Sequence, residues 1–269
     1  MAELIKDKKE IKRIRTYIEG LDENIEGGIP EGHIVLVCGT AGTMKSTLCF
    51  NLMYNEAIKG KNCLYISLEQ SSESLIQHMV NMDYDLGKIN LVTMDDISDI
   101  GETIKKAKSK KGSFSIVDLA AIRKKIKATT VGPSANWLNA IKNTINKIKT
   151  DAGCDILVLD SLSALYVLTK FQDARSELFY VFEFLRDLKL TSFLISEMPL
   201  TKDKYSPYEI ESFLSDGIIK VELNERYRKV TREISIVKMR ATEHNTDVFT
   251  LEFKNKKLKA LYGGETPLV

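Results

Sequence analysis

The fold is decided by the stretch Gly39-Thr40-Ala41-Gly42-Thr43-Met44-Lys45-Ser46-Thr47. An apolar run at 34–38 stands before it, and apolar residues recur at helical spacing after it until Gly60 stops the pattern. A short continuous apolar run predicts a strand buried on both faces, and the later spacing predicts a helix. The stretch is therefore expected to be a glycine-containing loop that joins a buried strand to a helix.

This loop fits the phosphate-binding pattern G-x-x-x-x-G-K-[S/T] at Gly39, Lys45 and Ser46, whereas Met44 replaces the second glycine. Successive backbone N–H groups and the positive end of the helix dipole attract an anion. Lys45 is expected to reach the β- and γ-phosphates of ATP, and the Ser46 hydroxyl is expected to ligate Mg²⁺. The residues predicted to bind the nucleotide here are Thr40, Ala41, Gly42, Thr43, Met44, Lys45, Ser46 and Thr47.

Two carboxylates are candidates for chemistry at this loop. Asp160 ends an apolar strand at 156–160, as does the carboxylate that holds the Mg²⁺ hydration shell in such proteins, although many buried strands end in an Asp that only starts a turn. Glu69 follows the strand at 63–68. Because the carboxyl ends of parallel strands line the ligand crevice, Glu69 is a candidate general base for the attacking water. The alternative is a solvated Glu before a helix.

Strands alternate with helical patterns through most of the chain, which predicts a mainly parallel, twisted sheet with helices on both faces. The last strands follow one another without a helix and indicate an antiparallel C-terminal extension. The lysine-rich segment 95–130 is irregular, so we expect a charged insertion outside the core. We predict a single α/β domain over residues 1–269. The expected strands are 34–38, 63–68, 89–92, 156–160, 192–196, 217–222, 231–239 and 249–253, and the expected helices are 45–58, 71–81, 136–149 and 177–189.

Composition narrows the class of protein. With 269 residues, 39 Lys and Arg, and 37 Asp and Glu, the formal charge is +2, which gives no global reason to expect nucleic acid or an acidic membrane as a partner. Hydrophobic content of 43% and charged content of 28% exclude a disordered chain, a collagen and a coiled coil. No apolar run approaches the roughly 20 residues that span a bilayer. We expect a cytoplasmic protein without membrane insertion, with free thiols at Cys38, Cys49, Cys63 and Cys154.

Further motifs extend the pattern on both sides of the loop. They lie at 15–22, 27–32, 40–43, 67–70, 160–161 and 215–219, followed by Lys238-Met239-Arg240-Ala241-Thr242-Glu243-His244. The last is close to the signature Lys-Met-Arg-Gly-[Ser/Thr]-x-His. In this ordered set the chain resembles the KaiC-like branch of the RecA-superfamily P-loop ATPases, in its single-domain, archaeal form. The resemblance runs from about Thr16 to Phe253.

The resemblance implies roles that the residues alone do not fix. Glu69 would be the catalytic base, and Lys45 would act with it on the γ-phosphate. Lys238 and Arg240 would reach across a subunit interface to the γ-phosphate of a neighbour's ATP, where cations lower the barrier. The residues that would line the same nucleotide from that side are Met239, Thr242 and His244. Self-association is implied, with a ring of six subunits. Without the resemblance, residues 238–240 would be read as an exposed strand with alternating charges.

Three departures from the family pattern are present. A side chain at position 44 costs about 1 kcal/mol or more where the loop needs positive φ, so we expect altered affinity or turnover. Gln70 replaces the second acidic residue after the 63–68 strand, which is consistent with slow turnover. The third departure is that this chain has one such domain, whereas the family's clock protein has two. The Ser-Thr pair of that protein's phosphorylated segment is absent at Ser212-Phe213, so autophosphorylation is not carried over.

The favoured function is a Mg²⁺-dependent ATPase that binds and hydrolyses ATP and regulates a protein partner that the sequence does not identify. One alternative is a nucleotide-gated scaffold with little turnover. Another is a recombinase paralogue acting on DNA, for which the lysines between Lys105 and Lys127 and at the N-terminus are the only support. Those lysines are more simply a solvated surface, because only Phe114 interleaves them as a base-stacking aromatic. Nucleic acid is thus not favoured as a partner.

Overall fold

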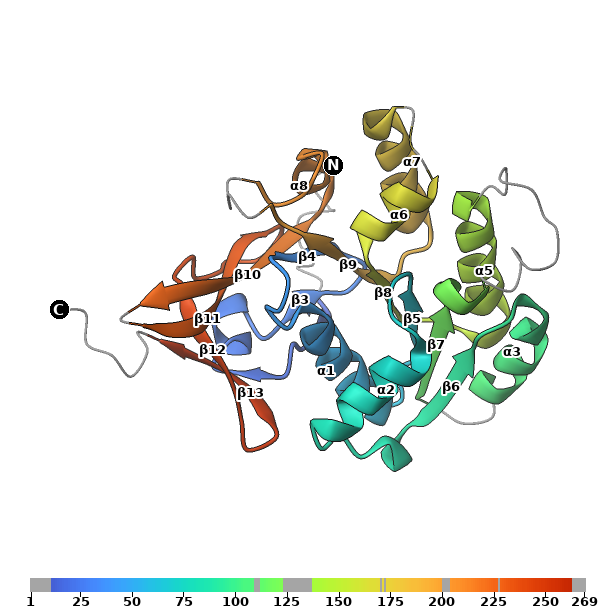
Figure 1. Cartoon of the computed structure of the whole chain (residues 1–269), viewed down its shortest axis with the longest axis horizontal. Coiled ribbons are helices and arrows are strands. Elements are labelled where there is room, and N and C mark those ends of the chain that lie inside the picture. Colours follow the sequence, from blue (N-terminus) through green and yellow to red (C-terminus); the bar gives the residue numbers. More distant parts are fainter. Residues whose placement is uncertain are drawn as a thin grey trace, which may run out of the picture.

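The computed structural model describes residues 11–108, 112–122, 137–169, 171, 173–199, 204–226 and 228–262. A large twisted sheet extends across the molecule, and helices pack against it (Figure 1). The sheet has eleven strands in the order β2-β13-β12-β11-β10-β4-β9-β8-β5-β7-β6. A separate two-stranded sheet pairs β1 (Arg13–Ile14) with β3 (Ile29–Pro30).

The parallel part of the sheet carries the strand–helix alternation that the sequence predicts. From β10 to β6, every neighbouring pair in the order is parallel. Parallel strands need crossover connections, which the intervening helices supply. The strands are β4 (Ile34–Gly39), β5 (Cys63–Ser67), β6 (Asn90–Met94), β7 (Ser113–Asp118), β8 (Ile156–Asp160), β9 (Thr191–Glu197) and β10 (Gly217–Arg226).

The antiparallel C-terminal extension is also confirmed. β10 forms a long hairpin with β11 (Lys229–Met239), which pairs with β12 (Phe249–Lys254) and then β13 (Lys257–Tyr262). The short β2 (Ile18–Glu19) pairs with β13 in parallel and is the terminal strand on this side of the sheet. These strands lie at the left of the molecule in Figure 1.

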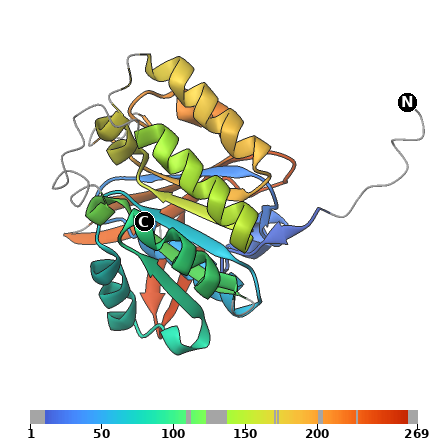
Figure 2. The same cartoon turned by 90° about the vertical axis from the view of Figure 1, so that its right-hand side faces the viewer.

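Helices cover both faces of the sheet because its central strands are apolar on both sides. Val35 and Val37 of β4 pack into a core with α1 (Lys45–Ile58) and α2 (Ser72–Asn81). Ile34 and Leu36 pack into the opposite core, whose helices include α5 and α7, which Figure 2 shows on one face. No helix in the described ranges is long and apolar enough to cross a membrane. The helices of this second face are α3 (Ile100–Lys108), α5 (Trp137–Ala152), α6 (Leu162–Thr169), α7 (Ala174–Asp187) and α8 (Ile210–Leu214).

The expectation that residues 95–130 form a charged insertion outside the core is wrong for their described part. β7 is buried along its whole length and lies between β5 and β6 in the sheet. The lysines of α3 misled the interpretation: they lie on its exposed face, while Ile104 and Ala107 pack inward. Residues 123–130 of the predicted insertion lie outside the described residues.

The four cysteines are free thiols, as predicted. Cys38, Cys49 and Cys63 are buried, and burial raises the pKa of all three and of the half-buried Cys154. For Cys38 and Cys154 the pKa reaches about 12, which lowers the reactive thiolate fraction about 1,000-fold. We therefore expect little reaction of the native chain with a disulfide reagent, and four thiols per chain in guanidinium chloride. A fast-reacting native thiol would contradict this prediction.

Candidate active site

The phosphate loop connects the end of β4 to the start of α1. Gly39 is tightly enclosed, since a Cβ atom there would lie 2.2 Å from the carbonyl oxygen of Val221 on β10. Gly42 and Met44 both have left-handed backbone conformations, with φ of 78° and 76°. The loop therefore turns sharply before α1 begins at Lys45. This turn brings the loop to the helix N-terminus, where free backbone N–H groups favour an anion.

Lys45 is buried within the loop that it follows. Its Nζ atom donates hydrogen bonds to the carbonyl oxygens of Gly39 at 2.9 Å and Thr40 at 2.8 Å. Burial lowers the pKa of Lys45, an effect that the carboxylates of Glu197 and Asp160 oppose. Because a charged acceptor binds an ammonium more strongly than a neutral carbonyl does, a phosphate oxygen here would be a better partner for Lys45.

Ser46 and Asp160, the two predicted metal ligands, lie side by side. Ser46 Oγ donates to Asp160 Oδ2 at 2.7 Å, and the hydroxyl of Tyr65 on β5 donates to the same oxygen. Burial raises the pKa of Asp160, and both hydroxyl contacts oppose this. Hydroxyl and carboxylate oxygens are the hard ligands that suit Mg²⁺. The pair therefore fits a Mg²⁺ ion held beside bound phosphates, with Tyr65 orienting the carboxylate.

Glu69 lies on the same edge of the sheet, just beyond β5. Ser161, just beyond the neighbouring strand β8, donates its Oγ hydrogen to Glu69 Oε1. The Ser67 hydroxyl donates to the Gln70 carbonyl oxygen at 2.6 Å and fixes the turn that carries Glu69. The cavity at this edge has a volume of about 520 Å³. It is lined by Ala41, Gly42, Thr43, Met44, Lys45, Ser46, Thr47, Glu69, Gln70, Ser74, Leu75, His78, Asp160, Ser161, Ile195, Glu197 and Arg232.

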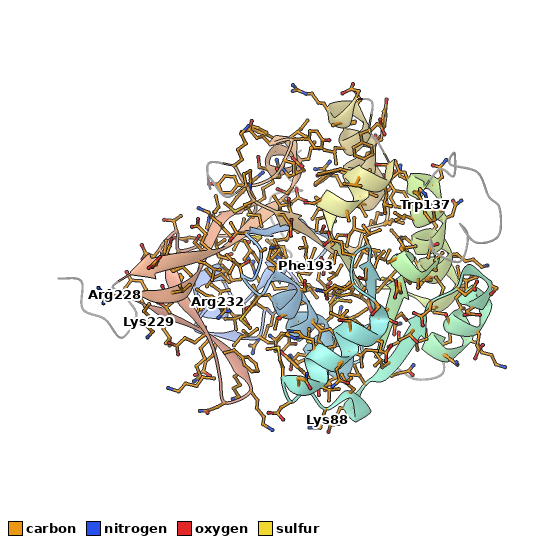
Figure 3. All side chains as sticks on the ribbon, viewed as in Figure 1. Lys88, Trp137, Phe193, Arg228, Lys229 and Arg232 are labelled. Atoms are coloured by element: carbon orange, nitrogen blue, oxygen red, sulfur yellow. The ribbon has the colours of Figure 1, made fainter. Side chains whose placement is uncertain are left out.

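Two basic residues of this cavity were not singled out from the sequence. Arg232, on β11, donates from Nε to the Gly42 carbonyl oxygen at 3.4 Å. Figure 3 shows Arg232 between the hairpin tip and the centre of the sheet. His78 on α2 has its Nε2 atom 3.4 Å from Thr47 Oγ1. No local motif marks either residue, because each enters the cavity from an element far from the loop in sequence.

Lys238 and Arg240 lie away from this chain's own phosphate loop. The Arg240 N–H donates to the Asp216 carbonyl, and the Asp216 N–H donates to the carbonyl of Ile34, where β4 begins. The loop follows Gly39, at the other end of β4 and roughly 16 Å along the strand. β11 thus places Arg232 at its own phosphate loop, whereas Arg240, which follows the last residue of β11, lies at the opposite end of the parallel strands.

The remaining signature residues lie near Arg240. Thr242 Oγ1 accepts a hydrogen bond from Arg13 at 2.8 Å, and His244 Nδ1 lies 3.1 Å from the Thr242 carbonyl oxygen. Met239 differs, since its side chain is 3% exposed and packs against Gly217 in the core. If Met239 contacts a neighbour's nucleotide as predicted, its backbone atoms and not its side chain would make that contact.

Comparison with known proteins identifies the family. The model of the family described as "ATPase: KaiC" matches residues 14–262. The chain belongs to the KaiC ATPase family. A UPF0273 protein of Saccharolobus solfataricus is 31% identical over 240 residues, which cover 87% of this chain and 77% of that protein. A UPF0273 protein of Thermotoga maritima is 26% identical over 253 residues, covering 91% and 94%.

The fold of KaiC-like proteins is shared as well. The crystal structure of a KaiC-like protein from Pyrococcus horikoshii superposes with a TM-score of 0.72 and covers 93% of this chain and 99% of that chain. At 23% identity this likeness shows the fold alone. The predicted RecA-like α/β fold and the predicted KaiC-like family are both confirmed. Residues 39–47 fit the P-loop pattern expected of a KaiC-family chain.

Met44 is the unusual residue of this KaiC-family loop. It has the left-handed conformation that a glycine adopts freely, and it precedes α1 without a side-chain cap. We expect the Met44→Gly variant to exceed Met44→Ala in free energy of unfolding by about 1 kcal/mol, because both lose the Met side chain and only glycine relieves the strain. Urea unfolding of the two variants measures the difference. Equal stabilities would contradict it, and Met44→Gly is also expected to change ATP affinity or turnover.

Proposed function

We propose that this KaiC-family protein hydrolyses ATP with Mg²⁺ at a site that a neighbouring subunit completes, and that its nucleotide cycle regulates a partner protein. The observation that carries the proposal is the meeting of three groups in one cavity. These are the buried cation of Lys45, the oxygen pair of Ser46 and Asp160, and the carboxylate of Glu69. A cation, a metal-ligating pair and a base are the parts that phosphoryl transfer to water requires.

The residues act in different ways on bound ATP. Lys45 offers its ammonium group to the phosphate oxygens where negative charge develops. Ser46 and Asp160 would hold Mg²⁺, which supplies further neutralisation of phosphate charge when bound. Glu69 takes the proton of the attacking water, and the Ser161 hydroxyl orients its carboxylate by donating to Oε1. Gln70 cannot share the proton as a second carboxylate would, which favours slow turnover.

The shared site is supported by where the signature cations lie. Arg240 is level with the start of β4, whereas the P-loop follows its end, so one chain cannot bring both to one γ-phosphate. A neighbouring subunit that places its Arg240 surface against the P-loop surface of this chain makes a head-to-tail contact. Repeated contacts of this kind close into a ring when the rotation between neighbouring subunits permits it. A six-subunit ring and the nucleotide contacts of Lys238, Met239, Thr242 and His244 form part of the proposal.

A nucleotide-gated scaffold with little turnover is the second candidate. The observation that favours it is the left-handed backbone of Met44 at the centre of the P-loop. Strain at that residue can hold the loop in one geometry that binds ATP and advances the reaction poorly. The DNA-binding alternative rests on lysines alone, and the exposed lysines that the structure describes on α3 are equally accounted for as a solvated surface.

Phosphate release with and without Mg²⁺ tests the proposal. We expect release to require Mg²⁺ and to stop when EDTA is added. We further expect Ser46→Ala to lower Mg²⁺-dependent turnover about 10-fold. The substitution removes the hydroxyl that would ligate Mg²⁺ beside Asp160. Ser74→Ala is the matched control, since Ser74 lines the cavity without contacting Asp160. ATP binding without phosphate release would favour the scaffold.

A further inference from the structure

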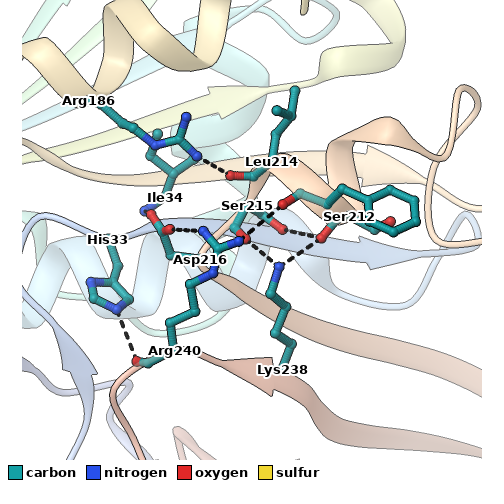
Figure 4. Close-up of polar contacts among 10 residues, drawn as sticks. His33, Ile34, Arg186, Ser212, Leu214, Ser215, Asp216, Lys238 and Arg240 are labelled. Carbon is teal, nitrogen blue, oxygen red and sulfur yellow. Dashed lines mark hydrogen bonds and ion pairs between the residues drawn. The ribbon is translucent and has the colours of Figure 1, made fainter. Parts of the chain in front are cut away.

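Lys238 and Arg240 are held by one short segment of this chain. Lys238 Nζ donates to the carbonyl oxygens of Ser212 at 3.0 Å and Ser215 at 2.7 Å. Arg240 Nη1 donates to Asp216 Oδ1 at 2.7 Å, as Figure 4 shows. Both cations therefore take their direction from residues 211–216, which we call the platform.

The platform cannot hold its shape alone, because α8 is five residues long. Glu211 anchors it from below with a fully buried carboxylate. One oxygen accepts from the hydroxyl of Tyr166 on α6, and the other accepts from Ser206 at 2.6 Å. Burial raises the pKa of Tyr166, which keeps its hydroxyl protonated and donating. Removing a partner from a buried carboxylate costs more than removing an exposed contact.

Tyr166 ties the platform to a helix of the same chain. It lies on α6, which follows directly after Ser161, the residue that orients Glu69. The Tyr166 ring is itself fixed, with Tyr208 edge-on at 4.8 Å between ring centroids. Arg186 of α7 adds a second brace through the Leu214 carbonyl oxygen.

We propose that Tyr166 and Glu211 are positioning residues, which hold the platform so that Lys238 and Arg240 are aimed at the ATP of the neighbouring subunit. The inference rests on the proposed shared site. Neither residue lines the P-loop cavity of its own chain. Their loss is therefore felt at the neighbour's site, where a misplacement of about 1 Å can cost up to about 100-fold in rate.

Mixed assemblies separate the two sites. The loop chain carries Arg240→Ala and keeps Glu69, whereas the finger chain carries Glu69→Gln and keeps Lys238 and Arg240. Only a loop chain followed by a finger chain forms a complete site. We expect Tyr166→Phe in the finger chain to lower phosphate release by the mixture about 10-fold. The same change in the loop chain costs nothing further. Any site that would use the Lys238 and Arg240 positions of that chain is already inactive through Arg240→Ala.

Controls distinguish positioning from general damage. Tyr208→Phe in the finger chain removes a neighbouring hydroxyl that does not contact Glu211, and is expected to change release less than about twofold. Glu211→Gln keeps an acceptor for Tyr166 and should retain most of the release. Ser206→Ala is a milder second variant, expected to act only in the finger chain. Thermal unfolding and ATP binding of each variant confirm that it is folded.

The outcomes decide the inference. Loss confined to the finger chain supports it. Equal loss in either chain means that Tyr166 stabilises the fold generally, and unchanged release means that the platform needs no anchor; both overturn it. If the mixture without Tyr166→Phe regains no release at all, the shared site itself is contradicted, and the inference fails with it for that distinguishable reason.

Discussion

Replacing Glu69 by Gln is expected to lower steady-state ATP turnover by about 100-fold or more. The amide keeps the size of the side chain and an oxygen that accepts from Ser161, so the geometry of the cavity is preserved. It cannot take a proton from the attacking water. ATP affinity should change little, because Lys45, Ser46 and Asp160 still hold the phosphates and the metal ion.

The measurement is phosphate release at saturating Mg²⁺ and ATP, with ATP affinity determined separately by calorimetry. Glu73→Gln is the matched control: it makes the same chemical change on the exposed first turn of α2, outside the cavity. Turnover equal to the parent in Glu69→Gln would exclude Glu69 as the base. Loss of ATP binding in the same variant would show a structural role instead.

The centre of the site could be predicted because its signals are local. The P-loop is one uninterrupted stretch, and Asp160 ends a strand that is apolar throughout. In a parallel sheet the ends of such strands meet at one edge, so their proximity follows from the strand–helix alternation. The 2.7 Å contact between Ser46 and Asp160 joins two elements that the sequence places separately.

Other parts of the fold were hidden by composition. β7 carries buried serines at Ser113 and Ser115 and follows a lysine-rich helix, so the hydrophobic signature of this strand between β5 and β6 is weak. β13 did carry one, since Leu258 and Ala260 are buried in alternation with exposed or half-buried lysines. Because lysines dominate the segment, this period of two is weak and the sequence analysis predicts no strand there.

Long-range polar contacts were beyond the reach of the sequence. Tyr65 reads as an ordinary aromatic of a buried strand, and its contact with Asp160 joins residues 95 positions apart. Glu211 has the local sequence of a surface residue in a charged turn, although it lies on α8 with its carboxylate fully buried. A buried carboxylate can be recognised only when its hydrogen-bond donors are known, and those come from other elements.

The largest expected effect comes from Arg240. We expect Arg240→Ala to lower turnover about 1,000-fold, because an arginine that neutralises transition-state charge contributes on that scale. ATP binding should persist, since Arg240 lies at the opposite end of the parallel strands from its own P-loop. Arg15→Ala is the matched control, as it removes an exposed arginine that belongs neither to the platform nor to the P-loop cavity.

Mixing restores activity if the site is shared. An equal mixture of inactive Arg240→Ala and Glu69→Gln chains should regain about one quarter of parental turnover, because half of the positions supply an intact Glu69 and half of their neighbours supply an intact Arg240. Two chains that each contain a whole site would regain nothing on mixing. The fraction depends on random assembly, so subunit exchange is first established by size-exclusion chromatography of labelled chains. Recovery near one quarter would place Arg240 of one chain at the ATP of the next, whereas no recovery after proven exchange would return Arg240 to a structural role at the start of β4.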